Sequence, residues 1–488
     1  MHRRDFLTAS AGLAALLASP EAAHAAAAQL AAAPDWTLAV RDLEADVARR
    51  PMRLVRGRPP AGLRGELFRN GPARFHRPGG SATHWFDGDG MVRSFRIADG
   101  RASVAARFVD TPKRRREAQL GAVVTPGFAT PARAGAVLES NDSANAANTS
   151  VLPVGDELWA LWEAGSPVAL DPVTLETRGV RTLRPDLAHM PFLAHPRIEP
   201  DGRIWNLGLA GKRAFVWRLA ADGAVEAGET IPLPRASYVH DFTATERNLV
   251  IVLQPWTTRS GGQAFVSELS WRAQDGVQVL VVDKDDLSKR RLYELPAFFA
   301  FHMGDAWADG DGTIRFDICT ERDPTFAVNG ARELLVGAFT PDIHGAQLQL
   351  VTLRPDGRAE LTPTGVSAEF PTSDPRRAGT VRRLTAHVSK PAARRPMMQG
   401  LATYDWATGR SRVFDYGSRL VAEEAVFAPR PGSGDEFDGW LVAPAINLAA
   451  GATELHVFEA RRVDDGPLCT WRADLALPAG FHGRWRQA

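Results

Sequence analysis

The feature that most constrains the fold is a turn dipeptide, Asp-Gly, which recurs between short runs of apolar or alternating residues. It occurs, among other places, at residues 99–100, 201–202, 222–223, 275–276, 311–312, 356–357, 438–439 and 465–466. Asp-Gly supplies the positive φ angles of a type I′ turn, so each pair between two β-like runs predicts a hairpin. From about Gly62 onward the sequence has no long run of helical periodicity. We therefore expect an all-β chain made of many antiparallel hairpins.

A loose internal repeat accompanies these turns. An apolar run ends in Asp and is followed shortly by Thr or Ser at residues 168–174, 281–288 and 403–409. Similar units that recur through an all-β chain indicate a β-propeller, whose blades are four-stranded sheets around a central channel. The spacing of the units is irregular, which predicts insertions between strands. The best candidate is the Pro-, Gly- and Arg-rich stretch 111–136, which we expect to form a long functional loop or lid.

Length, charge and cysteine content narrow the possible functions. A chain of 488 residues buries a large core, and a propeller keeps this size in one domain. The 58 basic and 57 acidic residues give a net charge of +1, so there is no broad electrostatic attraction to nucleic acid. The two cysteines, Cys319 and Cys469, exclude a cysteine-rich zinc site and leave room for one disulfide bridge at most. Any metal must therefore be bound by His and carboxylate side chains.

The N-terminus carries a targeting pattern. Arg3 and Arg4 precede a short apolar stretch, and Ala-His-Ala at residues 23–25 has the small-x-small form of a cleavage site. No apolar run reaches the roughly 18 residues that a membrane-spanning helix needs. The segment resembles a bacterial twin-arginine export signal, and the alternative is an ordinary amphipathic helix. We expect residues 1–25 to be a signal peptide, residues 26–488 to form one propeller domain, and the mature protein to be periplasmic.

Four of the twelve histidines lie in apolar or aromatic surroundings: His195, His240, His302 and His482. They are too far apart in sequence for a local chelate, but residues at the inner ends of different blades meet at a propeller axis. A lone histidine in apolar surroundings is more often a hydrogen-bonded core residue, so both readings stay open at this point. His482 lies in a terminal segment rich in Gly, Phe and Trp, which indicates a chain end held in the body of the protein.

Several sequence blocks carry a resemblance to a known family. They are LFRNGP at 67–72, HWFDGDGM at 84–91, AHP at 194–196, VHDF at 239–242, FHMGDAW at 301–307, PRPG at 429–432 and GFHG at 480–483. Because these blocks occur together and in this order, the sequence resembles the carotenoid cleavage oxygenase family. That family also contains lignostilbene-cleaving dioxygenases and a retinoid isomerohydrolase. The resemblance implies a seven-bladed β-propeller with a dome of loops and helices over its iron-bearing face.

The resemblance also implies the metal site. One Fe(II) would be held by His195, His240, His302 and His482. Glutamates of the family accept the outer N–H of several such histidines, which fixes the tautomer and orientation of each ring. The matching positions are Glu163, Glu369 and Glu424, and Glu423 competes with its neighbour for the last role.

The implied activity is cleavage of a C=C bond of a carotenoid or apocarotenoid by O2, which gives two carbonyl products. Relatives that cleave phenolic stilbenes use a lysine and a tyrosine where this chain has Trp162 and Phe108, so we expect a lipophilic conjugated polyene as substrate. Phe301 is a further candidate for the tunnel wall. The alternatives are lignostilbene or phenylpropene cleavage on the same scaffold, a non-oxidative isomerohydrolase, and a propeller that only binds ligands.

A lipophilic substrate has to be drawn from a membrane, so we also expect peripheral membrane contact. The charge run at residues 113–116, Lys-Arg-Arg-Arg, is either a solvated surface or part of that contact.

Overall fold

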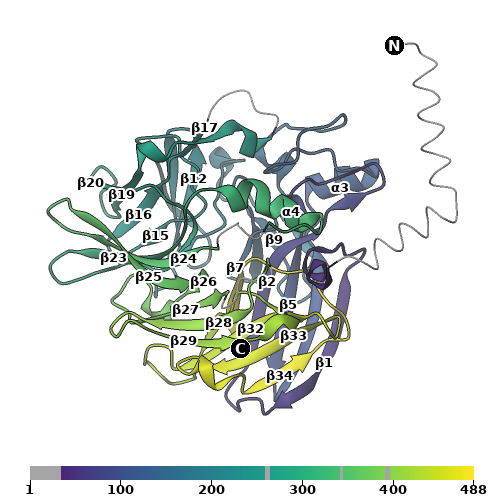
Figure 1. The fold of residues 1–488 in the computed structure, drawn as a ribbon. Coiled ribbons are helices and arrows are strands. Elements are labelled where there is room, and N and C mark those ends of the chain that lie inside the picture. Colours follow the sequence, from purple (N-terminus) through teal and green to yellow (C-terminus); the bar gives the residue numbers. More distant parts are fainter. Residues whose placement is uncertain (1–33, 259–263, 341–344, 391–395) are drawn as a thin grey trace, which may run out of the picture.

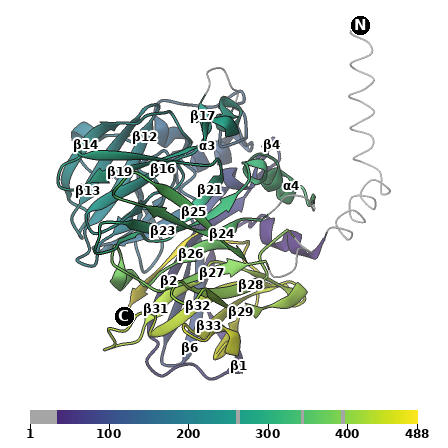
Figure 2. The same ribbon diagram turned by 60° about the vertical axis from the view of Figure 1, so that its left-hand side comes forward.

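The computed structural model describes residues 34–258, 264–340, 345–390 and 396–488, so the predicted signal peptide lies outside the described residues. The chain is all-β and propeller-like, with small sheets that lie side by side around the centre of the molecule (Figures 1 and 2). Within the described ranges no helix has both the length and the apolar character needed to cross a membrane. Both cysteines are free and buried.

Five separate sheets follow one another along the chain, each a meander in sequence order. The first contains β7 (Ser150–Val154), β8 (Glu157–Leu161), β9 (Val168–Leu170) and β10 (Thr177–Val180). The second contains β11 (Arg197–Ile198), β12 (Ile204–Ala210), β13 (Arg213–Leu219) and β14 (Val225–Pro232). The third contains β15 (Thr243–Ala244), β16 (Asn248–Leu253), β19 (Val277–Asp283) and β20 (Arg290–Leu295).

The fourth sheet contains β21 (Phe299–Met303), β22 (Trp307–Ala308), β23 (Ile314–Glu321), β24 (Gln347–Leu353) and β25 (Ala359–Ser367). The fifth contains β26 (Glu369–Thr372), β27 (Leu384–Ser389), β28 (Gly400–Asp405) and β29 (Arg410–Asp415). The internal repeat marks the connection between the last two strands of the first, third and fifth sheets. At each of these connections an Asp side chain, for example that of Asp171, accepts hydrogen bonds from backbone N–H groups two or three residues later.

A ten-stranded sheet joins the two ends of the chain. Its strands are β1 (Val47–Gly57), β2 (Gly65–Arg74), β5 (Asp89–Ala98), β6 (Arg101–Phe108), β30 (Leu420–Ala422), β31 (Val426–Pro429), β32 (Gly439–Asn447), β33 (Ala452–Glu459), β34 (Cys469–Arg472) and β35 (Gly483–Gln487). β1 pairs with β34, and the C-terminal β35 pairs with β2. The terminal segment is therefore held in the body of the protein, as its composition predicted.

Apolar clusters fill the spaces between neighbouring sheets. In β16, Leu249, Ile251 and Leu253 belong to the cluster shared with the second sheet, whereas Val250 and Val252 belong to the cluster shared with the fourth. Successive side chains of a strand point to opposite faces, and both faces are covered here. This explains why such strands read as continuous apolar runs rather than as alternating patterns.

The Asp-Gly turns are mostly of another type than predicted. Asp99 and Gly100 both have positive φ, 51° and 72°, and form the expected two-residue turn between β5 and β6. At 201–202, 222–223, 311–312 and 356–357 only the Gly has positive φ, and the Asp carboxylate accepts the N–H two residues later. These loops are longer, so Gly alone takes the left-handed position. The pair 275–276 makes no hairpin, because it joins strands of different sheets.

Short helices and small hairpins make up the remaining described elements. The α-helices are α3 (Pro112–Leu120) and α4 (Ala331–Leu335), and η7 (Phe326–Gly330) is a short π-helix that leads into α4. The short hairpin strands are β3 (His76–Arg77), β4 (Gly80–Ser81), β17 (Trp256–Thr258) and β18 (Leu269–Trp271). Short 3-10 helices are η1 (Asp35–Val40), η2 (Trp85–Asp87), η3 (Asn141–Ala144), η4 (Pro185–Leu187), η5 (Phe265–Glu268), η6 (Ala273–Asp275), η8 (Pro375–Arg377), η9 (Gly417–Arg419) and η10 (Val463–Asp465).

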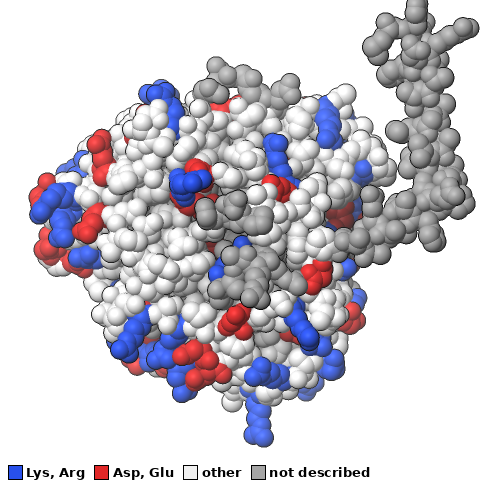
Figure 3. Space-filling model, in the orientation of Figure 1, with Lys and Arg blue, Asp and Glu red and all other residues white. Residues whose placement is uncertain are grey.

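Stretch 111–136 contains a helix and is not a loop throughout. Thr111 caps α3 by accepting the Arg114 N–H, and Gly121 ends it in the left-handed conformation. Lys113 is buried and paired with Asp89 and Glu117, at 2.9 and 3.0 Å, so the predicted charge run does not include it. On the face drawn in Figure 3, Lys and Arg are interspersed with Asp and Glu and form no single basic patch.

Candidate metal centre and substrate cavity

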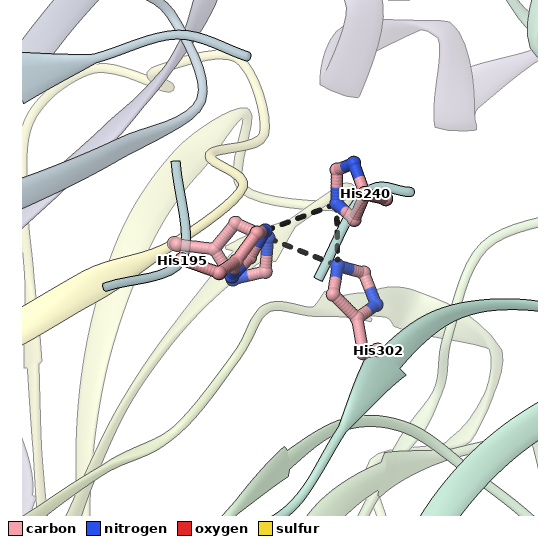
Figure 4. A group of neighbouring side chains, drawn as sticks. His195, His240 and His302 are labelled. Carbon is pink, nitrogen blue, oxygen red and sulfur yellow. Dashed lines mark hydrogen bonds between the residues drawn. The ribbon is translucent and has the colours of Figure 1, made fainter. Parts of the chain in front are cut away.

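The four histidines singled out by their surroundings come together at the centre of the molecule. One ring nitrogen from each lies within 4.8 Å of the others. The Nε2 atoms of His195 and His240 are 3.0 Å apart, those of His240 and His302 are 3.3 Å apart, and those of His302 and His482 are 3.1 Å apart. In Figure 4 the rings of His195, His240 and His302 turn these nitrogens toward one another.

Strand order places these side chains. His195 lies two residues before β11, the first strand of the second sheet, and His240 three residues before β15, the first strand of the third. His302 lies in β21, the first strand of the fourth sheet. His482 directly precedes β35, whose pairing with β2 brings it beside Asn70. The glycine after it allows this approach, because a Cβ on Gly483 would lie 2.6 Å from the Phe68 carbonyl oxygen. The centre therefore needs three sheets and the chain end together.

The donor set fits a single divalent metal such as Fe(II). Four converging imidazole nitrogens offer four lone pairs, and imidazole is a suitable ligand for iron. Burial, reinforced by the neighbouring imidazoles, holds the pKa of His195 well below its ordinary value, and burial lowers the pKa of His482 to about 4. These two rings are thus kept in the neutral form that binds metals.

Three of the four rings are oriented by glutamates. His240 Nδ1 bonds Glu163, His302 Nδ1 lies 2.5 Å from Glu369, and His482 Nδ1 lies 3.0 Å from Glu424. A carboxylate on Nδ1 takes the N–H there and leaves the Nε2 lone pair free for a metal. Among the described residues His195 has no carboxylate partner. Its ring instead packs against those of His482 and His240, with centroids 4.4 and 4.6 Å away.

Each glutamate is supported differently. Glu424 is bonded by the Gly483 N–H at 2.7 Å and paired with Arg69 at 3.3 Å. Neighbouring Glu423 instead accepts the Gly480 N–H at 2.7 Å. Of these two glutamates, only Glu424 contacts His482. Glu163 accepts the Tyr238 hydroxyl at 3.0 Å.

Glu369 is held by its own backbone. It accepts the N–H of Phe370, whose φ of 55° is rare for a residue with a large side chain. This strained conformation places the Phe370 ring 4.9 Å from the ring of His302 and 5.1 Å from that of His482, measured between centroids. Backbone strain of this kind persists where surrounding structure requires it, and it concentrates at functional sites.

An apolar cavity opens on one side of the four histidines. It is partly open to solvent, and His240, His302 and His482 border it. Most of its wall near the histidines is aromatic: Trp85, Phe86, Phe128, Trp162, Phe301 and Phe481. Trp162 and Phe301 thus lie where the sequence predicted. Trp85, Phe86 and Phe481 lie in the HWFDGDGM and GFHG blocks. Phe128 lies in stretch 111–136, which was expected to form a functional loop or lid, although this residue was not singled out.

The structure places Phe108 outside this wall. It ends β6 opposite Met91 of β5, and both side chains belong to the apolar cluster of the ten-stranded sheet. Arg114 of α3 covers its ring at 4.7 Å. The register of β5 and β6 points Phe108 into this core, and it is absent from the described lining of the cavity.

A polar cavity lies on the other side of the histidines and was not predicted. It is bordered by His195, His302 and His482 together with Arg197, Asp241, Asp305, Glu424, Arg484 and Arg486. Arg197 binds both carboxylate oxygens of Asp241, at 2.7 and 2.8 Å, and reaches Asp305 at 3.2 Å. Arg484 donates to the Pro196 carbonyl at 3.3 Å.

These charged residues follow the histidines in sequence. Asp241 is one residue after His240, and Arg197, Asp305 and Arg484 are two or three residues after the other three. They connect the segments that carry the histidines, because each contact joins two different segments. The sequence contains a charged residue one to three positions after each of the four histidines. Which of these residues form pairs depends on which segments lie together in the fold.

Comparisons with known proteins extend over nearly the whole chain. The sequence profile of the family described as "Retinal pigment epithelial membrane protein" matches residues 41–487. The chain is 28% identical over 460 residues to the apocarotenoid-15,15'-oxygenase of Synechocystis sp., with 89% of this chain and 92% of that protein covered. It is 27% identical over 473 residues to lignostilbene-alpha,beta-dioxygenase isozyme III of Sphingomonas paucimobilis, with 89% and 93% covered.

One similar solved structure contains a metal. The crystal structure of cobalt-substituted Synechocystis ACO matches with a TM-score of 0.84 and 25% sequence identity, covering 93% of this chain and 98% of that chain. The likeness therefore extends over most of both chains rather than over one motif.

Proposed function

Because the chain belongs to the family of the retinal pigment epithelial membrane protein, which includes the carotenoid cleavage oxygenases, we propose that it is a non-haem iron dioxygenase acting on a carotenoid or apocarotenoid. The reaction splits one C=C bond with O2 and gives two carbonyl products. The observation that carries this proposal is the position of the four histidines in the wall of an apolar, aromatic cavity.

The roles of the residues follow from their contacts. His195, His240, His302 and His482 would hold one Fe(II), and Glu163, Glu369 and Glu424 would keep three of the rings in the metal-binding tautomer. Fe(II) supplies the redox chemistry that allows O2 to react with a double bond.

The cavity wall selects the bond to be cleaved. Its aromatic side chains bury a conjugated chain by the hydrophobic effect and exclude water from the reacting atoms. Phe301 packs against His240 at 5.1 Å between ring centroids, so it lies directly beside the metal-binding group. A substrate that extends along this wall brings one of its double bonds to the histidines, and its length determines which bond that is.

Trp162 favours a polyene over a hydroxystilbene. It precedes Glu163 and lines the cavity without offering a cation to a phenolate. The relative that cleaves lignostilbene makes stilbenes the competing substrate class. Trp162→Lys places a cation there, and we expect cleavage of a 4-hydroxystilbene relative to an apocarotenal to rise about tenfold, the discrimination typical of one charged hydrogen bond.

The test is an incubation of the iron-loaded protein with an apocarotenal and with a hydroxystilbene, followed by mass spectrometry of the released aldehydes and measurement of O2 uptake. We expect apocarotenal cleavage with O2 consumed in step with product. Product without O2 consumption would indicate an isomerohydrolase. A protein that binds no iron, and whose stability is unaltered by His302→Ala, would indicate a module that only binds ligands.

We also propose a seven-bladed count for the propeller. The ten-stranded sheet divides into one group around β2, β5, β6 and β1 and a second around β31 to β34, joined by the β1–β34 pairing. If these two groups are counted as two blades, the five separate sheets and the ten-stranded sheet together make seven blades. The helices η7 and α4 contribute Phe326 and Leu334 to the cavity, which supports a dome over the iron-bearing face.

Export and membrane contact form a further proposal. Residues 1–25 would direct folded, metal-loaded protein to the periplasm, and residues 26–488 would be the mature domain. Val336, which is 78% exposed, follows α4 at the cavity, and such an apolar residue near an entrance favours peripheral membrane contact. Arg3→Lys with Arg4→Lys should abolish export. Flotation with anionic liposomes tests attachment, and protein found only in the soluble fraction would contradict it.

A further inference from the structure

One carboxyl group of the apolar cavity has no role in the metal centre. Glu321 is the last residue of β23 and borders the cavity. Its strand pairs with β21, which carries His302, and Glu321 lies opposite Phe299. The Phe299 ring packs on that of Phe301 at 4.7 Å between centroids. Glu321 therefore belongs to the same wall as the aromatic residues beside the histidines.

Glu321 differs from the other glutamates of this cavity in having no partner. Glu163 and Glu369 bond histidines, Glu423 accepts the Gly480 N–H, and Glu333 accepts from the backbone N–H and hydroxyl of Thr340. Within the described part of the chain Glu321 makes neither a hydrogen bond nor an ion pair. Glu321 is partly buried in the cavity wall, so a ligand that covered its carboxyl group without a hydrogen bond would cost free energy, and a ligand oxygen that pairs with it would avoid that cost.

The surroundings of Glu321 define that ligand atom. Burial, followed by the charges of Glu369 and Asp323, raises the pKa of Glu321 well above its ordinary value, which favours the neutral acid. A neutral carboxylic acid donates one hydrogen bond and accepts others. The two nearby carboxylates repel an anionic group. The one lysine of the described lining, Lys390, lies over the Phe339 ring at 5.1 Å and makes no ion pair with Glu321.

We propose that Glu321 is a specificity-determining residue that pairs with a neutral oxygen, a hydroxyl or a ring carbonyl, at one end of an otherwise hydrocarbon polyene. This inference rests on the proposed function and adds the class of end group to it. Because the pairing holds that end at one place in the wall, it also fixes how far the polyene advances past the histidines. Substrates with an oxygen on the terminal ring should therefore bind more tightly than their unsubstituted counterparts.

The experiment compares three polyenes of equal length, whose terminal ring carries a hydroxyl, a carbonyl or no oxygen. Affinity is measured without O2 by quenching of tryptophan fluorescence, since Trp85 and Trp162 border the cavity. In the unmodified protein we expect an oxygen-bearing ring to bind about fivefold more tightly, the effect of one hydrogen bond between neutral groups. Comparing the hydroxyl and carbonyl probes shows which of the two end groups pairs with Glu321.

Glu321→Leu should abolish this preference, whereas Glu321→Gln, whose amide also donates and accepts, should keep at least half of it. The matched control is Glu294→Leu, a glutamate exposed on β20 and outside the cavity, which should leave the preference unaltered. Thermal unfolding and iron content show that each variant is folded. The inference fails if the unmodified protein shows no preference or if Glu321→Leu retains it. Cleavage in air is scored separately, so absence of cleavage with an intact binding preference would overturn the proposed reaction alone.

Discussion

The two cavities that meet at the four histidines are built from opposite kinds of residue. The cavity on the side of Phe86 and Phe301 is aromatic, and the one on the side of Arg197 and Asp241 is charged. His302 and His482 border both cavities. His240 borders the aromatic cavity and His195 the charged one, among the described lining residues.

The difference between the two cavities indicates that one binds the substrate and the other positions the metal ligands. Apolar walls gain free energy by covering a hydrophobic ligand, but they impose little directional constraint. Paired charges and hydrogen bonds impose a strong directional constraint, because their geometry is specific and breaking them inside a protein costs free energy. The aromatic side therefore suits substrate, and the charged side holds together the segments that carry the metal ligands. Substitutions on the two sides should have different consequences.

The largest effect is expected where the two cavities share a ligand. His302→Ala removes one nitrogen of the four and leaves Glu369 without its partner. We expect iron per chain to fall below detection and activity to fall by more than about 100-fold, since even the partners of metal ligands contribute up to that factor. Iron analysis and product formation measure the two effects.

The control for this variant is His76→Ala, because His76 is exposed and lies outside the cluster. A His302→Ala protein that retains a full complement of iron would show that the four histidines are not one metal site.

Arg197→Met tests the charged side. Asp241 would remain buried without its cation, and breaking a buried pair destabilises a protein by about 3–5 kcal/mol. Urea unfolding should show this loss of free energy, while the ratio of affinities for different polyenes stays unaltered. Arg410→Met, at an exposed position of β29, is the control. An altered polyene preference with unaltered stability would reverse the roles assigned to the two sides.

Glu424→Gln and Glu163→Gln compare carboxylates that border different cavities. We expect iron affinity to fall by about 10- to 100-fold in each, because a neutral amide orients the imidazole less strongly. Glu424→Gln should have the larger effect, since Arg69 loses a charge partner as well. Metal competition with a chelator of known affinity measures both variants. Equal losses would show that support from Arg69 contributes nothing at the metal.

Tyr238→Phe should give the smallest effect. The variant keeps the ring of Tyr238, which packs 5.1 Å from that of Trp256, and removes the hydroxyl that bonds Glu163. One such hydrogen bond contributes about 1 kcal/mol, or roughly fivefold in iron affinity. The same chelator competition measures it, with Tyr404→Phe, a tyrosine of β28 outside the described linings of both cavities, as the control. No change in iron affinity would show that the hydrogen bond from Tyr238 to Glu163 does not contribute to metal binding.

Much of the candidate site could be predicted from single residues in their local context. His195, His240, His302 and His482 were identified by apolar surroundings and sequence blocks, and the three glutamates followed from the resemblance. The contacts of His240 with Glu163, of His302 with Glu369 and of His482 with Glu424 agree with those expectations.

The errors concern residues whose neighbours come from elsewhere in the chain. Lys113 was assigned to a surface charge run, but Asp89 and Glu117 pair with it inside the protein. Phe108 was expected in the substrate tunnel, and the register of β5 and β6 turns it into a core. The charged cavity was not predicted, because Arg197 and Asp241 pair across two segments whose contact no local pattern specifies.

The sequence by itself determined the all-β class and the position of the turns, because these depend on local preferences, and its resemblance to a known family supplied the identity of the four histidines that converge. The tertiary structure decided that β35 closes onto β2, that His482 thereby completes the ligand set, and that two opposite cavities meet at the histidines. The physical reason is that register and sheet packing bring together groups that are hundreds of residues apart, and no local pattern specifies which side of a ring will face arginine and which will face phenylalanine.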